Sequence, residues 1–152
     1  MNTLNAALSR QANLAPLVLR LVLGALLLFH GIDKFDTGLT NVESFFASND
    51  VPAAGFTAPL VAVIEIVVGI ALLLGIGTRI AAAIQVAVLL GAMAFVKLPA
   101  ILGSAELDLA YIAGLSAVVL LGPGRLSVDE AIDADTVIDL RNRVDDRESV
   151  DA

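Results

Sequence analysis

The chain has 152 residues, of which 58% are hydrophobic and only 16% are charged. Soluble domains carry about 25% charged residues, and a small globule needs a polar surface to stay dispersed in water. Residues 1–126 contain 7 acidic and 6 basic side chains, too few to cover such a surface. The composition therefore argues against an ordinary soluble domain and favours a chain embedded in lipid.

The net charge of −7 belongs mostly to the tail, which holds 9 acids and 3 arginines after Leu126. Because no cluster of lysine or arginine offers phosphates a counter-charge, we expect no nucleic-acid partner. The chain has no cysteine, which excludes disulfides, thiolate metal sites and iron–sulfur clusters. Its single histidine excludes a bis-histidine haem within one copy. No cofactor motif is present, and we expect no metal site.

Charged residues divide the chain into four apolar stretches that approach the length of a membrane helix, about 17–25 residues. The predicted spans are 16–34, 56–76, 79–97 and 106–122. The predicted fold class is all-α: an integral membrane four-helix bundle over residues 16–126, after an amino-terminal segment 1–15. Four buried helices of a soluble protein are the alternative, which the low charge content disfavours.

Basic residues that flank short loops predict the orientation of the spans. Seven arginines share the side of the two termini and of the turn after the second span: Arg10, Arg20, Arg79, Arg125, Arg141, Arg143 and Arg147. The opposite side has only Lys34 and Lys97. We therefore expect a multi-pass protein of the plasma membrane with both termini in the cytoplasm.

A long outer loop, residues 35–55, joins the first two spans. Thr40 and Glu43 have the spacing of a capping box, and Phe45 and Phe46 follow on one helical face. These features predict a short helix in the outer interface. An irregular loop with two phenylalanines that dip into the membrane is the alternative.

The end of the fourth span begins an acidic cytoplasmic tail, residues 127–152. Gly122-Pro123-Gly124 is expected to stop the fourth helix. Ser127 and Glu130 form a second capping box, which predicts a short helix from Val128.

Small residues at four-residue spacing predict where helices approach closely in lipid. They are Gly69 in the second span, Ala83, Ala87 and Gly91 in the third, and Ala110, Ala113, Gly114 and Ala117 in the fourth. We interpret all of them as seams against neighbouring helices.

Glu65 lies near the middle of the second span, roughly 14 Å from either end by helical rise. A lone carboxylate at that depth costs at least a few kcal/mol, so it should face the protein interior and be paired or protonated. Arg20, His30 and Lys34 of the first span are candidate partners. Since Arg and Lys extend along the membrane normal, depth alone does not choose. We favour Arg20 or His30 as the direct neighbour, with Lys34 closing the outer end.

Together Arg20, His30, Lys34 and Glu65 predict an intramembrane polar pocket for a quinone headgroup, a small anion or a relayed proton. The alternative is a buried polar lock that fixes helix register. Carboxylates at the outer start of the fourth span suit the positive end of that helix. One of them, Glu106, is a secondary candidate for the outer mouth of the pocket.

Several short segments stand in a characteristic order along the chain. They are Leu19-Arg20-Leu21, His30-Gly31, Lys34-Phe35, Glu65-Ile66-Val67-Val68-Gly69, Thr78-Arg79 and Gly122-Pro123-Gly124-Arg125. This series resembles the DoxX family over roughly residues 16–130.

The resemblance implies a small four-helix membrane protein. Members of the family are linked to the membrane part of thiosulfate:quinone oxidoreductase in sulfur-oxidising archaea, and others to membrane-associated oxidoreductase complexes in oxidative-stress defence. The resemblance implies pocket roles for Arg20, Lys34 and Glu65, with His30 and Arg79 as further candidates. Without cysteine, however, this chain has no thiol to hold a sulfur intermediate.

The leading hypothesis is a membrane subunit or anchor that docks an oxidoreductase and offers it a quinone-accessible pocket. We expect no catalytic activity of its own. Two alternatives stay open: a carrier of protons or small solutes that works through Glu65, and a purely structural membrane protein.

Overall fold

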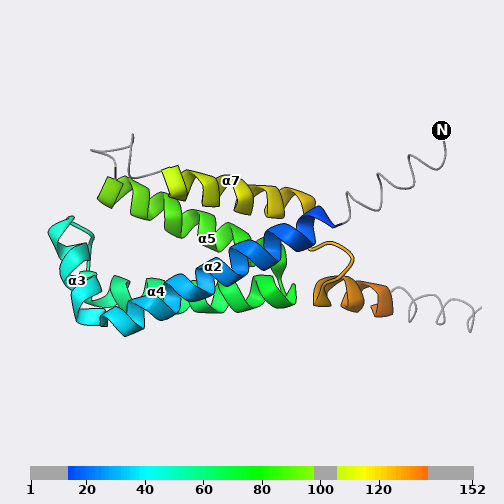
Figure 1. Ribbon diagram of the computed structural model, residues 1–152, viewed down its shortest axis with the longest axis horizontal. Coiled ribbons are helices and arrows are strands. Elements are labelled where there is room, and N and C mark those ends of the chain that lie inside the picture. Colours follow the sequence, from blue (N-terminus) through cyan, green and yellow to red (C-terminus); the bar gives the residue numbers. More distant parts are fainter. Residues whose placement is uncertain (1–13, 98–105, 137–152) are drawn as a thin grey trace, which may run out of the picture.

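The computed structural model describes residues 14–97 and 106–136, and all regular structure in these two ranges is helical (Figure 1). The elements are α2 (Ala15–Thr37), α3 (Leu39–Ser48), α4 (Ala54–Leu74), α5 (Thr78–Ala92), the π-helix η1 (Met93–Lys97) and α7 (Glu106–Leu121). The predicted all-α class is confirmed for the part of the chain that is described. The expectations for the amino-terminal segment and for the tail beyond residue 136 lie outside it.

Three helical stretches are long and apolar enough to cross a membrane: Ala15–Thr37, Ala54–Leu74 and Thr78–Val96. Their bounds agree with the first three predicted spans to within about three residues, close to the usual uncertainty of helix ends. α7 occupies the place of the fourth predicted span and has 16 residues. The length and composition of these helices agree with the expected membrane protein.

The four longest helices pack as two pairs, α2 with α4 and α5 with α7, and each pair also contacts the other through α2–α7 and α4–α5. The pairs lie close together where the short turn around Gly75 joins α4 to α5, and they separate toward α3, which lies across the opposite end (Figure 1). We refer to these as the Gly75 end and the α3 end.

Close backbone approach holds α2 against α4. A Cβ placed on Gly69 would lie 2.8 Å from the backbone nitrogen of Leu28, and one on Gly24 would lie 2.9 Å from the carbonyl oxygen of Gly69. A Cβ on Gly31 would lie 2.9 Å from the carbonyl oxygen of Ala62. The predicted seam at Gly69 is therefore confirmed.

The seam predicted on the third span is wrong. Ala83 and Ala87 are exposed, and a Cβ on Gly91 would meet no atom of the described part of the chain within 4 Å. The buried face of α5 consists instead of Thr78, Ala81, Ala82 and Gln85. Small residues lie on two faces of this helix, and their spacing does not tell which face meets a neighbour.

The predicted short helix in the loop between the first two spans is present as α3, but its predicted capping box is wrong. α3 begins at Leu39 directly after Gly38, and no side chain caps its start. Gly38 adopts a φ of 93°, which turns the chain sharply out of α2. Thr40 consequently lies inside the helix, where its carbonyl oxygen accepts a hydrogen bond from Ser44 Oγ at 2.8 Å.

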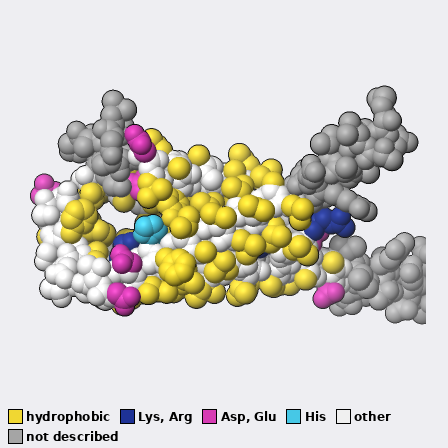
Figure 2. All heavy atoms as spheres, viewed as in Figure 1, with side chains coloured by type: hydrophobic (Ala, Val, Ile, Leu, Met, Phe, Trp, Pro, Cys, Tyr) yellow, Lys and Arg dark blue, Asp and Glu magenta, His cyan; other side chains and the backbone are white. Residues whose placement is uncertain are grey.

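The apolar side chains divide into a small core and a large exterior. The buried cluster consists of Leu23, Leu27, Val68, Leu72, Ala81, Ala82, Tyr111, Leu115 and Val118. Many larger apolar side chains point outward, among them Leu120 at 80% and Phe29 at 70% exposure. Figure 2 shows this apolar exterior between the two ends of the molecule. Such a surface suits contact with lipid tails.

A further helical stretch, residues 128–136, follows α7 at the Gly75 end. The Ser127 hydroxyl oxygen accepts a hydrogen bond from the backbone nitrogen of Glu130 at 3.1 Å, and the hydroxyl donates to the Gly124 carbonyl at 2.7 Å. Ser127 thus acts as an N-cap for this stretch.

Candidate functional site

A cavity of about 690 Å³ lies between the two helix pairs, toward the α3 end. Its lining comes from all of the named helices and is mostly apolar. Figure 2 shows this region as a hollow beside a lysine and a histidine. The lining residues that carry ionisable groups are His30, Lys34, Glu65, Asp108 and Tyr111.

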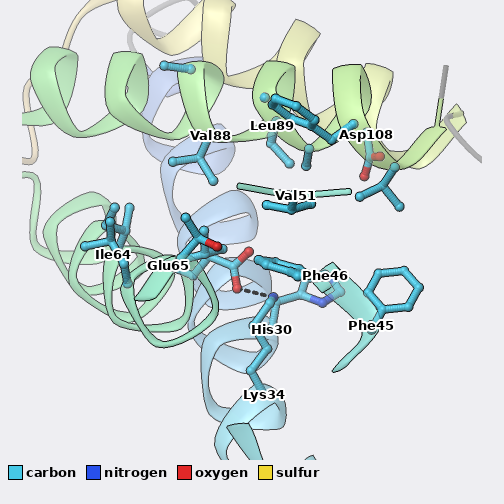
Figure 3. A pocket seen from close by; sticks show the side chains of 18 of the residues that line it. His30, Lys34, Phe45, Phe46, Val51, Ile64, Glu65, Val88, Leu89 and Asp108 are labelled. Atoms are coloured by element: carbon cyan, nitrogen blue, oxygen red, sulfur yellow. Dashed lines mark hydrogen bonds and ion pairs between the residues drawn. The ribbon is translucent and has the colours of Figure 1, made fainter. Parts of the chain in front are cut away.

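Lys34 and Glu65 form an ion pair in the cavity wall, with Lys34 Nζ donating to Glu65 Oε2 (Figure 3). The Glu65 side chain is 9% exposed and that of Lys34 is 21% exposed. The other carboxylate oxygen of Glu65 faces the cavity (Figure 3). The pair neutralises a charge that would be costly to bury alone, and it leaves a polar edge inside an apolar space.

The direction of the helices explains why Lys34, and not Arg20, meets Glu65. Side chains lean toward the amino terminus of their own helix. α2 runs toward the α3 end and α4 runs back, so Lys34 and Glu65 lean toward each other. Arg20 leans the same way as Lys34 but starts nearer the Gly75 end, so its side chain points away from Glu65. The expectation that Arg20 or His30 is the direct neighbour of Glu65 is wrong: Lys34 pairs with Glu65, and the ring of His30 contacts that of Tyr111.

Arg20 lies at the Gly75 end, fully buried and outside the cavity lining. Its Nη2 donates to the carbonyl oxygen of Leu126 at 2.6 Å, which ties the first helix to the segment after α7. Its Nε and Nη1 have no hydrogen-bond partner among the described residues. The four residues predicted for one pocket are thus divided: three line the cavity and Arg20 belongs to the other end.

His30 lines the cavity beside Tyr111, with ring centroids 5.9 Å apart and planes inclined by 69°. Within residues 14–97 and 106–136 no group of three metal-ligating side chains occurs. Tyr111 is 5% exposed and is a lining residue that the sequence analysis does not identify. A signal was available, because a tyrosine inside an apolar span needs a polar partner or a cavity for its hydroxyl.

The secondary candidates do not reach the cavity lining. Glu106 is exposed in the first turn of α7, where its charge suits the helix dipole. Arg79 is exposed at the Gly75 end, with its guanidinium close to Gly122.

Two aromatic segments border the cavity. Phe45 and Phe46 reach it from α3, and Phe95 reaches it from η1, where α5 continues as a π-helix. π-helical turns are rare and often mark functional sites. The cavity therefore combines one charged pair with several aromatic rings.

Asp129 organises the Gly75 end. Its carboxylate accepts hydrogen bonds from the backbone nitrogens of Gly77 at 2.7 Å and Thr78 at 2.9 Å, which caps the start of α5. Its own backbone nitrogen donates to the Gly75 carbonyl at 3.0 Å. Burial raises the pKa of this carboxyl, but the two backbone hydrogen bonds and the charge of Arg20 outweigh burial and hold the pKa below its ordinary value.

This cap was not predicted, although the sequence carries one signal for it. The residue before α5 is Gly77, which has no side chain to cap its own helix, so a distant acceptor is required.

Comparison with known proteins identifies relatives of the chain. The DoxX family profile matches residues 15–98. The chain is 31% identical over 123 residues to the Bacillus subtilis protein named "Putative oxidoreductase CatD", covering 80% of this chain and 90% of that protein. It is 35% identical over 128 residues to the "Uncharacterized membrane protein Rv3486" of Mycobacterium tuberculosis, covering 75% and 78%. No solved structure gives a significant match. On its profile match and these two relatives, the chain belongs to the DoxX family.

Proposed function

We propose that the protein is a membrane subunit or anchor of a quinone-linked redox system, and that its cavity holds the quinone headgroup. The observation that carries this proposal is the Lys34–Glu65 ion pair in the wall of a mostly apolar cavity of about 690 Å³. Small-molecule sites commonly have volumes of about 300–1,000 Å³ and a few placed polar groups.

The chemistry of the pair suits a quinone. The Lys34 ammonium can donate a hydrogen bond to a quinone carbonyl, and the cavity-facing oxygen of Glu65 can accept one from a quinol hydroxyl. The apolar lining suits the ring and the first part of a lipid tail. Because the two charges of the ion pair neutralise each other, the pair itself favours neither an anion nor a cation.

The position of the cavity favours a ligand that arrives from the bilayer. α3 covers the end of the molecule, and its phenylalanines line the cavity (Figure 1). Leu60 of α4 and Ala87 of α5 also line it and are exposed on neighbouring helices. An opening between these helices would face lipid tails, where quinones dissolve.

The proposed arrangement in the membrane is a four-helix bundle. α7 would complete it as a fourth span of about 24 Å, together with the residues before it. Arg79 and Arg125 lie at the Gly75 end, which on the positive-inside rule is the cytoplasmic side. Both chain termini would then be cytoplasmic, and the acidic tail would be available to a partner enzyme.

Electron transfer is assigned to a partner oxidoreductase rather than to this chain. The sequence has no cysteine and no cofactor motif, and the relative from Bacillus subtilis is named as an oxidoreductase. The proposed role is therefore to bring a quinone and a redox enzyme together at the membrane.

The test is a titration of the purified, detergent-solubilised protein with decylubiquinone, followed by its melting temperature. A ligand that binds only the folded state raises the melting temperature, by an amount that grows with the logarithm of the ligand concentration once this exceeds the Kd. Lys34→Met and Glu65→Gln are expected to weaken binding by about tenfold or more, because each removes a charged hydrogen-bonding group. Asp36→Asn is the control, since Asp36 is an exposed carboxylate on the same helix.

The alternatives give different results. If Glu65→Gln lowers stability but binds the quinone as tightly as the wild type does, the ion pair is a structural lock and the proposal is wrong. If decylubiquinone causes no shift, while proton or solute flux into reconstituted vesicles is lost in Glu65→Gln, the protein is a carrier.

A further inference from the structure

One glycine of the long helices has no packing role. Gly24, Gly31 and Gly69 are explained by close helix packing, because a Cβ added at each would lie 2.9 Å or less from an atom of the neighbouring helix. Gly91 on α5 differs, because a Cβ placed there would meet no atom of residues 14–97 and 106–136 within 4 Å. Its backbone lies within a regular helix, so no left-handed conformation requires glycine either.

Glycine inside a helix lowers the stability of the helix, and at Gly91 no close helix packing offsets this loss. Relative to alanine, glycine destabilises a helix interior. Gly91 lines the cavity, as does Ala87 one turn earlier on the same face of α5. The missing side chain therefore keeps space open inside the cavity.

The space beside Gly91 belongs to the cavity whose other walls carry polar and aromatic groups. Lys34 and Glu65 contribute the ion pair from α2 and α4. Phe46 from α3 and Tyr111 from α7 contribute aromatic rings to the same lining. Figure 3 shows Phe46 and Glu65 on the side of the cavity opposite Val88 and Leu89 of α5. A bare helix surface facing a charged pair across an aromatic-lined space is suited to a flat ring.

We infer that Gly91 is a specificity-determining residue of the cavity: its bare backbone is the surface on which a planar quinonoid ring lies, with the polar edge of the ring toward Lys34 and Glu65. This inference rests on the proposed function and adds to it the wall that selects for a flat ligand. It predicts that side-chain volume at position 91 competes directly with the ligand.

The test measures decylubiquinone affinity by melting-temperature shift in a series of increasing volume, Gly91→Ala and Gly91→Leu. Affinity is expected to fall about twofold for alanine and more than about tenfold for leucine, in line with the volume filled. The melting temperature without ligand is expected to stay equal or to rise, because both residues are better helix formers and their Cβ meets no described atom within 4 Å.

Gly69→Ala is the matched control, since its new side-chain carbon would lie 2.8 Å from the Leu28 backbone nitrogen. It should lower the melting temperature without ligand and leave the affinity of the remaining folded protein near that of the wild type. Loss of stability without loss of affinity at position 69, and loss of affinity without loss of stability at position 91, would support the inference that Gly69 serves helix packing and Gly91 serves ligand binding.

Two results overturn the inference. If Gly91→Leu binds decylubiquinone as the wild type does, the ring does not lie on Gly91, and the proposed function is untouched. The inference is also wrong, and the proposed function again untouched, if Gly91→Ala loses as much affinity as Gly91→Leu. The loss of affinity would then come from the loss of backbone freedom before η1 and not from side-chain volume. If the wild type itself gives no shift, the proposed function fails and the inference fails with it.

Discussion

The two ends of this molecule are built in opposite ways. At the Gly75 end, fully buried Arg20 donates to the Leu126 carbonyl, and Asp129 accepts hydrogen bonds from the first residues of α5. Three segments far apart in the sequence are thereby tied together. At the α3 end the helix pairs separate around a cavity, and the Lys34–Glu65 pair lies in its wall.

The difference between the two ends explains how a small membrane protein can keep a cavity open. An unfilled interior loses packing contacts and lowers stability, and lipid gives helices no hydrophobic drive to associate. The hydrogen bonds and close packing at the Gly75 end hold the helices together, so the α3 end does not need to collapse. Function is then expected to reside at the α3 end and stability at the Gly75 end.

The largest effect is expected from crowding Arg20. A Cβ on Gly75 would overlap Nη1 of Arg20, and Gly75 also adopts a φ of 72°. Gly75→Ala should therefore cost about 3 kcal/mol or more in the free energy of unfolding, from backbone strain and displacement of a buried guanidinium. Reversible unfolding in mixed detergent micelles measures this loss of unfolding free energy.

Gly77→Ala is the matched control, because Gly77 has a φ of 54° but no atom within 4 Å of a new Cβ. It should cost only about 1 kcal/mol, the strain of the left-handed conformation alone. Equal losses at the two positions would show that Arg20 does not fix the Gly75 end.

A smaller effect is expected from removing the Asp129 cap. Asp129→Ala leaves the backbone nitrogens of Gly77 and Thr78 without their acceptor, which should cost about 2 kcal/mol. Asp129→Asn keeps one acceptor oxygen and should cost about half as much. Asp133→Ala, at an exposed position of the same helical stretch, should change stability by less than about 0.5 kcal/mol.

The same carboxylate predicts a pH dependence. Because the pKa of Asp129 is lowered in the folded protein, its stabilisation is complete above the ordinary aspartate pKa of about 3.9 and is lost as the pH falls through the lower folded value. The difference in unfolding free energy between wild type and Asp129→Ala should be constant near neutral pH and should shrink in acid. A difference that grows as the pH falls below about 4 would contradict the role of the carboxylate.

The sequence predicts the long elements well and the contacts between them poorly. The apolar stretches locate α2, α4, α5 and α7 because the length of a span is a one-dimensional property. The depth of a residue along a span is also a one-dimensional property, so the position of Glu65 in the sequence is enough to identify it as a buried charge. Depth does not by itself identify the partner of Glu65, because depth counted by helical rise leaves out the lean of each side chain toward the amino terminus of its own helix, which brings Lys34 rather than Arg20 to Glu65.

The remaining errors have the same origin. The small-residue stripe through Gly91 identifies a helix face without telling whether that face meets a helix or a cavity. The cap that Asp129 supplies to Thr78 joins residues 51 positions apart, and local capping rules do not reach that far. Both features depend on how whole helices are placed.

The smallest predicted effect lies at the α3 end, in the turn between α3 and α4. Asp50 and Ala53 adopt positive φ values of 56° and 51°, which non-glycine residues rarely do. Ala53→Gly relieves one strained position and should raise the unfolding free energy by about 0.5 kcal/mol, since part of the gain is offset by the freer unfolded chain. Ala54→Gly, at the first residue of α4, should lower it instead. If both variants lose stability, the turn between α3 and α4 is not strained at Ala53.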